Sequence, residues 1–379
     1  MPQWEAKHQA TPACKLLVGM VQCHVLRETG VNPSCSPSGG TCGWRPIDLE
    51  TRYKLAPSLG NGRGTVVALI ELGDLASAAT DLATYRKTFK LGKAPFKKFN
   101  QYGQQSDYPE SCQDFSWCVE TDLDIQMVSA SCPKCTIYLI EGGNCSGVVC
   151  GLEGAESAAV KLGAKIISNS WGCSSLYYGE NCGDSDFPKY FDTPGVAFLA
   201  SSGDSGYPEI QWPAALANVL AVGGTQLAGG SGSTYSETVW DGTGAGCATT
   251  TKKPKWQHDP DCTGRTIADI SAQAGCSPGV AEYTSTYSGW VGACGTSVAA
   301  PLTAGIVALA GNASSITGGK SFWELSAKKH KTELNVITSG TDGNCDNYIC
   351  QAGLSKKDGG YKTYSGPAGW GSPDGITAY

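Results

Sequence analysis

The middle of the chain alternates short apolar runs with longer segments of helical spacing, and this alternation limits the folds open to it. Runs of strand length occur at residues 65–72, 136–140, 165–168, 196–201 and 219–222. Segments with helical spacing lie between them, at residues 75–89, 120–131 and 148–162. Continuous Val/Ile/Leu strands that alternate with helices are what a parallel sheet covered on both faces requires. The sequence therefore predicts an α/β fold with a parallel sheet flanked by helices.

The two ends of the chain have a different character. Residues 1 to about 46 are predicted to be an irregular segment that carries Cys14, Cys23, Cys35 and Cys42. Residues 223–292 are rich in Gly, Ser and Thr, which favours loops and short strands. Residues 297–310 have helical composition, and the C-terminal region that follows is loop-rich. We find no internal repeat and no clear linker, so we expect one domain with a tail.

Charge and hydropathy exclude two classes of partner. The 28 basic and 34 acidic side chains give a net charge of −6, and no block of basic residues is present to neutralise phosphates. We therefore expect no nucleic-acid binding. No apolar run approaches the roughly 18 residues that a membrane-spanning helix needs, so we expect no membrane insertion.

Eighteen cysteines in a chain with little charge indicate disulfides and an oxidising compartment. We expect a secreted protein or one in an acidic lumenal compartment, with a leader missing because residues 1–30 show no signal-peptide pattern. Cys132 and Cys135 form a lone C-x-x-C, which could be a redox pair or half a zinc site. With no second such pair and no suitably spaced histidines, we interpret it as a structural disulfide.

A candidate nucleophile lies in the sequence CGTSVAAP, which ends at Pro301. Two small residues precede Ser297 and an Ala-rich helical stretch follows it. Ser297 would thus lie at a helix N-terminus, where backbone N–H groups and the helix dipole favour a developing oxyanion. Gly295 would let a substrate backbone approach closely. The alternative is an ordinary helix-capping serine.

A serine nucleophile needs a base, and the histidines are poorly placed to supply one. His8 and His24 lie in the N-terminal segment, while His258 and His330 lie in polar stretches. A carboxylate is therefore the expected base, and a Ser/His/Asp enzyme is the alternative.

Two carboxylates are spaced to act together. Glu120 and Asp124 stand at positions i and i+4 of a predicted helix and share one face. If buried, they would titrate as a unit, with one carboxyl driven to keep its proton. The alternative is a solvated first helical turn, where acidic residues are favoured by the helix dipole.

Two further motifs follow apolar runs. Asp204 lies in SSGDSG after one run, and Trp171 lies in SNSWG after another. The carboxyl ends of parallel strands are where such folds place their sites. The alternative for each motif is ordinary turn chemistry.

Together these motifs resemble the sedolisin family of serine-carboxyl peptidases, in which they occur in the same order. The resemblance rests on CGTSVAAP, the Glu120/Asp124 pair, SNSWG, SSGDSG and the acidic strand end in VALIELGD. It runs from about Trp44 to the C-terminus, so we divide the chain into an N-terminal segment of residues 1–43 and a peptidase domain of residues 44–379. It implies a subtilisin-like parallel α/β fold and the hydrolysis of polypeptides, and we expect a monomer.

The resemblance also implies roles for the matching residues. Ser297 would be the nucleophile and Glu120 the general base, with Asp124 orienting Glu120 and sharing a proton with it. Asp204 would take the oxyanion role. The hydrogen-bond network and the substrate-binding surface would further include Glu71, Trp171, Gly203, Gly295 and Thr296.

A carboxylate base has an ordinary pKa near 4.3, and a neutral aspartic acid in the oxyanion site requires acid or strong burial. We therefore expect activity at roughly pH 3–5 and failure near neutrality. A catalytically inactive relative that binds peptides or a partner protein in the same groove is the alternative.

The calcium site that the resemblance implies is doubtful in this chain. Val336, in LNVITSG, and Ser365, in YSGPAGWG, stand where the family has two aspartates. Calcium usually requires carboxylate ligands, so the sequence supports no cofactor prediction. A Cys345–Cys350 disulfide could stiffen this region instead. Other aspartates nearby in the sequence are Asp342, Asp346 and Asp358.

Overall fold

The computed structural model describes residues 10–15, 21–35, 42–143, 149, 151–174, 180–229, 235–287, 289–325, 327–354 and 363–379. Asp358, Cys145 and Cys150 lie outside these ranges. No helix among the described residues has both the length and the apolar character needed to cross a membrane.

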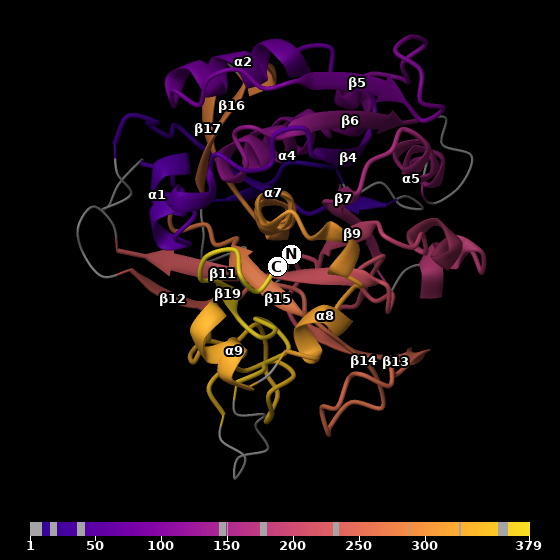
Figure 1. Cartoon of the computed structure of the whole chain (residues 1–379), viewed down its shortest axis with the longest axis vertical. Coiled ribbons are helices and arrows are strands. Elements are labelled where there is room, and N and C mark those ends of the chain that lie inside the picture. The colour runs from indigo at the N-terminus through magenta and orange to yellow at the C-terminus, as the bar shows by residue number, and fades with distance from the viewer. Residues whose placement is uncertain are drawn as a thin grey trace.

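A large, mostly parallel sheet forms the centre of the molecule, as predicted. Its strands follow the order β12–β11–β9–β7–β4–β6–β5, with β15 also paired to β11. All these pairs are parallel except β11 with β12. Figure 1 shows the strands stacked from β5 at the top to β11 below. Their bounds are β4 Val66–Leu72, β5 Phe96–Asn100, β6 Thr136–Gly142, β7 Ile166–Asn169, β9 Ala197–Ser201, β11 Val219–Ala228, β12 Ser236–Val239 and β15 Ile270–Gln273.

Helices cover this sheet because its strands are apolar on both faces. Helices α4 (Cys118–Ser131) and α7 (Thr296–Ala310) pack against each other and against several strands, while α2 (Ala78–Thr88) packs on α4 and α5 (Leu152–Lys161) on β4 and β6. Every residue of α4 is buried. The alternative of a solvated acidic turn at Glu120 is therefore wrong.

The strand ends bring distant parts of the sequence to one edge of the sheet. Glu71 at the end of β4 pairs with Glu141 on β6, and Asn169 at the end of β7 pairs with Ala200 on β9. The segments that follow β7 and β9 contain SNSWG and SSGDSG. This edge therefore carries the predicted site.

The N-terminal segment is more ordered than predicted. It contains β1 (Thr11–Pro12), β2 (Gln22–Cys23) and β3 (Leu26–Thr29), and β1 pairs with β3. Strand β3 also pairs with β17 (Gly289–Cys294), which pairs with β16 (Val280–Thr284). Strand β2 pairs with β8 (Trp171–Ser174). The expectation of an irregular segment is corrected: strands this short show no periodicity, and their partners lie far away in the sequence.

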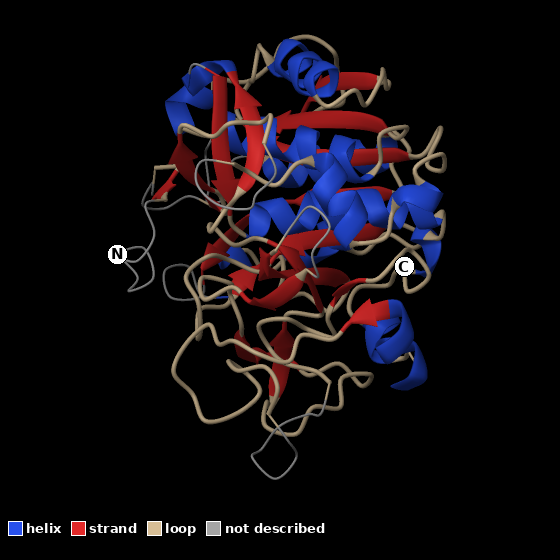
Figure 2. Ribbon diagram, turned by 90° about the vertical axis from the view of Figure 1, so that its left-hand side faces the viewer, coloured by secondary structure: helices blue, strands red, loops and turns tan. Residues whose placement is uncertain are grey.

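Loops dominate the lower third of the molecule in Figure 2, and Figure 1 shows yellow C-terminal segments in that part, in agreement with the predicted loop-rich C-terminal region. The remaining α-helices and strands among the described residues are two to seven residues long. They are the helices α1 Pro46–Arg52, α3 Cys112–Phe115, α8 Lys320–Trp323 and α9 Ala327–Glu333, and the strands β10 Gln211–Trp212, β13 Gly246–Lys252, β14 Gly264–Ile267, β18 Leu334–Asn335 and β19 Ser372–Pro373.

Disulfides connect neighbouring parts of the chain. Cys132 pairs with Cys135, so the C-x-x-C is a disulfide as predicted, and Cys345 pairs with Cys350. The other described pairs are Cys14–Cys23, Cys35–Cys42, Cys112–Cys118, Cys173–Cys182, Cys247–Cys262 and Cys276–Cys294.

Candidate active site

Ser297 is aimed at a carboxylate. It is the second residue of α7, after Thr296, and Gly295 caps the helix. The sequence predicted this position at a helix N-terminus. Its hydroxyl donates a hydrogen bond to Glu120 Oε2 at 2.9 Å and lies 3.2 Å from the carbonyl oxygen of Ser170. Ser297 and Glu120 are both fully buried, so this contact is shielded from water.

The carboxyls behind Ser297 form a continuous group. Asp124 lies one helical turn beyond Glu120 and is within hydrogen-bonding reach of both Glu120 and Glu71. Burial raises the pKa of Glu120, and the charge of Asp124 raises it further. Burial also raises the pKa of Asp124, to about 7, while hydrogen bonds from its neighbours hold it down. The group therefore shares protons and titrates as a unit.

Ser170 supports this group, and the sequence analysis assigned it no role. Its hydroxyl lies 2.8 Å from both Asp124 carboxyl oxygens, which fixes the orientation of the carboxylate. Its position in SNSWG, directly after β7, was the sequence feature that could have indicated this role. The sequence alone does not show that its side chain faces α4.

Asp204 is held through one oxygen by Thr296. The Thr296 backbone N–H and hydroxyl both donate to Asp204 Oδ1 at 2.8 Å. The Thr296 hydroxyl also lies 3.2 Å from the backbone N–H of Gly203, so Gly203 and Thr296 together fix this loop beside α7. Burial raises the pKa of Asp204 well above its ordinary value, although the Thr296 hydrogen bonds lower it.

The second oxygen of Asp204 points to the space beside Gly295. Asp204 Oδ2 is buried and has no hydrogen-bond partner among the described residues. A Cβ atom at Gly295 would stand 2.4 Å from Oδ2 and 2.3 Å from the carbonyl oxygen of His24. Gly295 also has a φ of 114°, which side chains rarely adopt. A larger residue here would block the approach of a carbonyl group to Asp204.

His24 enters the site from the N-terminal segment, and the sequence analysis missed it. The Ser297 N–H donates to the His24 carbonyl oxygen at 3.1 Å, and the His24 N–H donates to the Ser170 carbonyl oxygen at 3.2 Å. The imidazole Nδ1 lies 2.7 Å from Ser201 Oγ rather than against Ser297. The hydrogen-bond partner of the Ser297 hydroxyl is thus a carboxylate, as predicted.

Two predicted network residues differ in their contacts. Glu71 is buried beside Asp124, and burial together with the charges of Asp124 and Glu120 raises its pKa. Trp171 is buried with its ring 6.3 Å from that of Phe187, and its indole nitrogen has no hydrogen-bond partner among the described residues. Glu71 therefore belongs to the cluster of carboxyls behind Ser297, whereas the Trp171 indole makes no hydrogen bond to this cluster.

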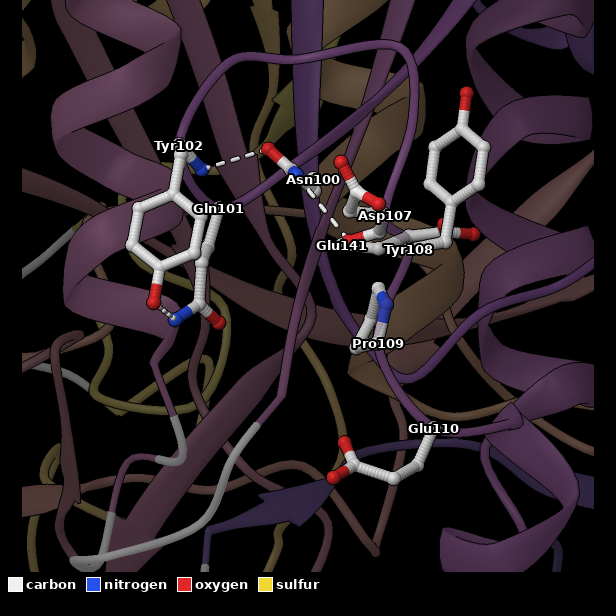
Figure 3. Close-up of a pocket in the computed structure, with 8 residues that line it drawn as sticks. All are labelled: Asn100, Gln101, Tyr102, Asp107, Tyr108, Pro109, Glu110 and Glu141. Carbon is white, nitrogen blue, oxygen red and sulfur yellow. Dashed lines mark hydrogen bonds between the residues drawn. The ribbon is translucent and has the colours of Figure 1, made fainter.

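A cavity opens at the same sheet edge (Figure 3), with a volume of about 280 Å³. Glu141 lies in its wall and accepts a hydrogen bond from the Leu75 N–H at 2.9 Å, and Lys98 Nζ lies 3.6 Å from its other oxygen. Burial raises the pKa of Glu141 to about 8. Its other lining residues are Asn100, Gln101, Tyr102, Asp107, Tyr108, Pro109 and Glu110.

The residues at the expected calcium positions do not fit that ion. Val336 has no ligand atom in its side chain, and Ser365 offers a neutral hydroxyl. Asp342 is buried, and burial raises its pKa. Among the described side chains, the His, Cys, Asp or Glu group compact enough for a metal is Cys14, Cys23 and Glu120, whose cysteines form a disulfide.

The chain and its fold are similar to those of known peptidases. The sequence profile of the subtilase family matches residues 116–370. Sedolisin from Pseudomonas sp. strain 101 is 27% identical over 397 residues, covering 94% of this chain and 65% of that protein. Kumamolisin from Bacillus sp. strain MN-32 is 28% identical over 313 residues, covering 74% of this chain and 54% of that protein. The chain thus spans less than two thirds of the length of either relative.

Solved structures agree on the fold. Pseudomonas sedolisin, a serine-carboxyl proteinase complexed with two molecules of pseudo-iodotyrostatin, matches with a TM-score of 0.75 and 28% identity. The match covers 89% of this chain and 96% of that one. A lanthipeptide protease matches with a TM-score of 0.53 and 15% identity, covering 88% and 92% of the two chains, which shows the fold alone. The fold is subtilisin-like, as predicted.

Proposed function

Because the chain belongs to the subtilase family, and to its sedolisin branch, we propose that it is an acid-acting serine-carboxyl endopeptidase. The observation that carries this proposal is the 2.9 Å hydrogen bond from the Ser297 hydroxyl to Glu120. It supplies a nucleophile in contact with a base, which is the arrangement that covalent catalysis by serine requires.

In the proposed mechanism, Ser297 Oγ attacks the carbonyl carbon of the substrate peptide while Glu120 takes its proton. Asp124, which the Ser170 hydroxyl holds in place, orients Glu120 and shares the proton with it. Glu120 then returns the proton to the departing amine. A water molecule hydrolyses the acyl-enzyme by the same two proton transfers.

Asp204 and the Ser297 N–H are the proposed oxyanion site. The N–H already binds a carbonyl oxygen, that of His24, and Asp204 Oδ2 borders the same space beside Gly295. A protonated Asp204 donates a hydrogen bond to the developing negative charge, and its raised pKa keeps that proton available.

Acid is the expected condition for this chemistry. Asp204 must be neutral and Glu120 must accept a proton, and a buried group of carboxyls cannot ionise completely without strong mutual repulsion. As the pH rises, the cluster of buried carboxyls loses protons, and Asp204 loses the proton that it would donate to the oxyanion. Because Glu120 must be ionised to accept a proton and burial raises its pKa, the acidic limb lies above the ordinary pKa of a carboxyl; we propose activity in acid that falls towards neutrality.

We also propose a cellular setting for the protein. The disulfides and the absence of a membrane-spanning helix among the described residues fit an extracellular protein. We propose that the protein is secreted or lumenal, acts as a monomer on polypeptides, and has its peptidase domain at residues 44–379.

The test compares wild type with Ser297→Ala on denatured protein at about pH 4 and about pH 7. We expect cleavage by wild type in acid, little at neutrality, and a loss of at least about 10³-fold in Ser297→Ala. Equal, negligible cleavage by both proteins would instead favour the inactive peptide-binding relative. Activity that peaks at neutral pH and disappears on histidine alkylation would favour a Ser/His/Asp enzyme.

A further inference from the structure

Asp204 lies in a segment whose position depends on contacts from other parts of the chain. This segment, residues 203–207, contains no helix or strand, and we call it the Asp204 loop. Ser205 is exposed and Asp204 is half-buried, so the packing of side chains does not by itself fix the loop. A donor in an oxyanion site must lie within hydrogen-bond reach of the reacting oxygen. The contacts that hold this loop therefore affect the proposed chemistry.

Backbone hydrogen bonds from two other segments hold the Asp204 loop. Residues 242–244 bind its start and its middle, with hydrogen bonds of 2.7 Å and 3.0 Å. At its end, the Tyr207 N–H donates to the Asp342 carbonyl oxygen at 3.1 Å. This second contact is close, because a Cβ at Gly206 would stand 2.5 Å from the same carbonyl oxygen. The C-terminal region of the chain thus reaches the loop that carries Asp204.

Asp342 belongs to a short hairpin, residues 340–352, that a disulfide closes. Its N–H donates to the Cys350 carbonyl oxygen at 3.1 Å, and the Thr341 hydroxyl donates to the same oxygen at 2.8 Å. Cys350 also forms the disulfide with Cys345 on the other arm. The disulfide therefore holds together the two arms that fix the backbone of Asp342.

The tip of this hairpin is fastened to the body of the molecule through Tyr348, which is buried. The Tyr348 hydroxyl donates to Asp259 Oδ2 at 2.8 Å and accepts the Asp261 N–H at 2.9 Å. Its carbonyl oxygen accepts the Gly366 N–H at 2.7 Å. The hairpin is thus fixed at its tip, while its base contacts the Asp204 loop.

We propose that the hairpin is a positioning element of the active site: through Tyr207, it holds Asp204 in the geometry of the oxyanion site. This inference rests on the proposed peptidase function and deepens it. The Cys345–Cys350 disulfide keeps the hairpin ordered, and the Asp342 carbonyl oxygen passes that order to the loop. The hairpin acts through Asp204 and takes no part in making or breaking a bond of the substrate.

The test opens the hairpin with the double substitution Cys345→Ser/Cys350→Ser, which leaves no lone thiol. We expect kcat at its pH optimum to fall by about three- to tenfold, with KM within about twofold of wild type. An oxyanion contact forms in the transition state, so its loss lowers kcat more than it weakens substrate binding.

The matched control removes a disulfide from the opposite edge of the sheet. Cys132 and Cys135 lie between the end of α4 and the start of β6. Cys132→Ser/Cys135→Ser should lower stability but leave kcat within about twofold of wild type. Equal losses of kcat in the two double variants would overturn the proposal.

The pH profile tests whether the effect passes through Asp204. Burial raises the pKa of Asp204, hydrogen bonds from Thr296 lower it, and the ionisable groups that face it are Glu209 and Glu120. A loosened loop admits water, so the pKa of Asp204 should fall. Because the proposed donor must be protonated, the alkaline limb of kcat should move down by about 0.5–1 pH unit. A limb that stays in place or moves up would contradict the proposal.

Combining the open hairpin with Asp204→Ala gives a direct measure of coupling. Asp204→Ala leaves no donor to position, so opening the hairpin in this background should lower kcat by less than about twofold. A loss as large as the one in wild type would show that the hairpin acts on the whole fold, and the positioning role would be wrong.

Tyr348→Phe is a second variant that keeps the disulfide. It removes the hydroxyl that binds Asp259 and Asp261, and we expect the same changes at a smaller size, with kcat lowered by about two- to threefold. A wild-type kcat and pH profile in this variant would contradict the hold of the hairpin tip on the site.

Hydrogen exchange in Ser297→Ala supplies a measurement that needs no activity. Opening the hairpin should speed exchange of the Tyr207 amide by about tenfold or more. Unchanged exchange would refute the proposed hold and leave the peptidase function standing. If instead wild type digests no protein in acid, the proposed function fails, and the role of the hairpin in it fails as well.

Discussion

Asp204 uses its two oxygens for different purposes. Oδ1 accepts both Thr296 donors, which fixes the side chain, while Oδ2 is buried without a partner among the described residues. An orphaned buried oxygen is costly unless it is protonated or meets a ligand. The proposed oxyanion role accounts for both the position and the raised pKa.

Two substitutions of Asp204 separate its role as a hydrogen-bond donor from the effect of its ionisable carboxyl. Asp204→Asn keeps an acceptor for Thr296 and supplies an N–H₂ donor that does not titrate, whereas Asp204→Ala supplies neither. We expect Ala to lose about 10²–10³ in kcat at acid pH, and Asn to lose less. The activity of Asn should also extend to higher pH. Profiles of kcat against pH check this, and equal losses in the two variants would remove Asp204 from the oxyanion site.

Ser170 offers a test of the proton-sharing group. Its hydroxyl binds both Asp124 oxygens and lowers the pKa of Asp124, so Ser170→Ala should raise that pKa. The acidic limb of the kcat/KM profile should then move up by about 0.5–1 pH unit. Ser314→Ala, at an exposed position of the 3-10 helix Ala313–Ser315, is the control and should leave the profile unchanged. A shift to lower pH would contradict the assigned hydrogen bond.

The site residues that could be predicted from the sequence are those that lie in a short, recognisable motif. Ser297 and Asp204 lie in motifs that also define their backbone turn, and helical spacing alone places Glu120 beside Asp124. His24 was not found because its carbonyl and N–H make the contacts, and these groups are common to nearly every residue. Ser201 was not found as its partner because that contact joins residues 177 positions apart.

At the scale of elements, the site depends on how closely α4 and α7 approach. Glu120 belongs to α4 and Ser297 to α7, so the spacing of the two helices sets the distance between base and nucleophile. Gly305 of α7 faces the end of α4: a Cβ there would stand 1.9 Å from Ser131 Oγ and 3.4 Å from Cys132 Cβ. The glycine allows this contact.

Gly305→Ala should therefore push the helices apart. We expect a loss of about 1–3 kcal/mol in the free energy of unfolding, together with reduced kcat. Gly154 in α5 is the matched control, because the atom nearest to its added Cβ lies 3.5 Å away. Gly154→Ala should be neutral or stabilising by up to about 1 kcal/mol. Chemical denaturation measures both, and equal stability of the two variants would contradict close packing at Gly305.

Burial and strand pairing explain which strands could be predicted from the sequence. Strands β4, β6, β7 and β9 are buried apolar runs, so their positions were predicted to within one or two residues. Strand β11 was predicted to end at residue 222 because Gly223 and Gly224 follow, yet both glycines pair with β15. Pairing with a neighbouring strand supplied the hydrogen bonds that local preference did not indicate.

At the scale of the whole molecule, the buried carboxyls couple folding to pH. Burial raises the pKa of Asp124 to about 7 and those of Glu141 and Glu156 to about 8. The folded protein then holds protons that the unfolded chain releases above about pH 4.5. Stability is therefore fully present in acid and is lost as the pH rises through the folded pKa values. This direction fits a protein that works in acid.

His24 acts in the opposite direction but in a different range. Burial lowers its pKa to about 3, so its contribution is intact above its ordinary value near 6.5 and is lost as the pH falls below that value. Between about pH 6.5 and pH 8 the carboxyls act without it. The slope of stability against pH should therefore be steepest between about pH 6.5 and about pH 7, below the folded pKa of Asp124, at up to about 1.4 kcal/mol per pH unit for each carboxyl.

Thermal unfolding of Ser297→Ala, which cannot digest itself under the proposed mechanism, measures this dependence. We expect its Tm to fall from about pH 5 to about pH 8. Glu156→Gln replaces a fully buried carboxyl by a neutral group of the same shape, and it should raise the Tm more at about pH 8 than at about pH 5. Glu324→Gln, at a side chain with 58% exposure, should leave the slope unchanged. A Tm that stays constant or rises with pH would mean that these carboxyls ionise in the folded protein at their ordinary values.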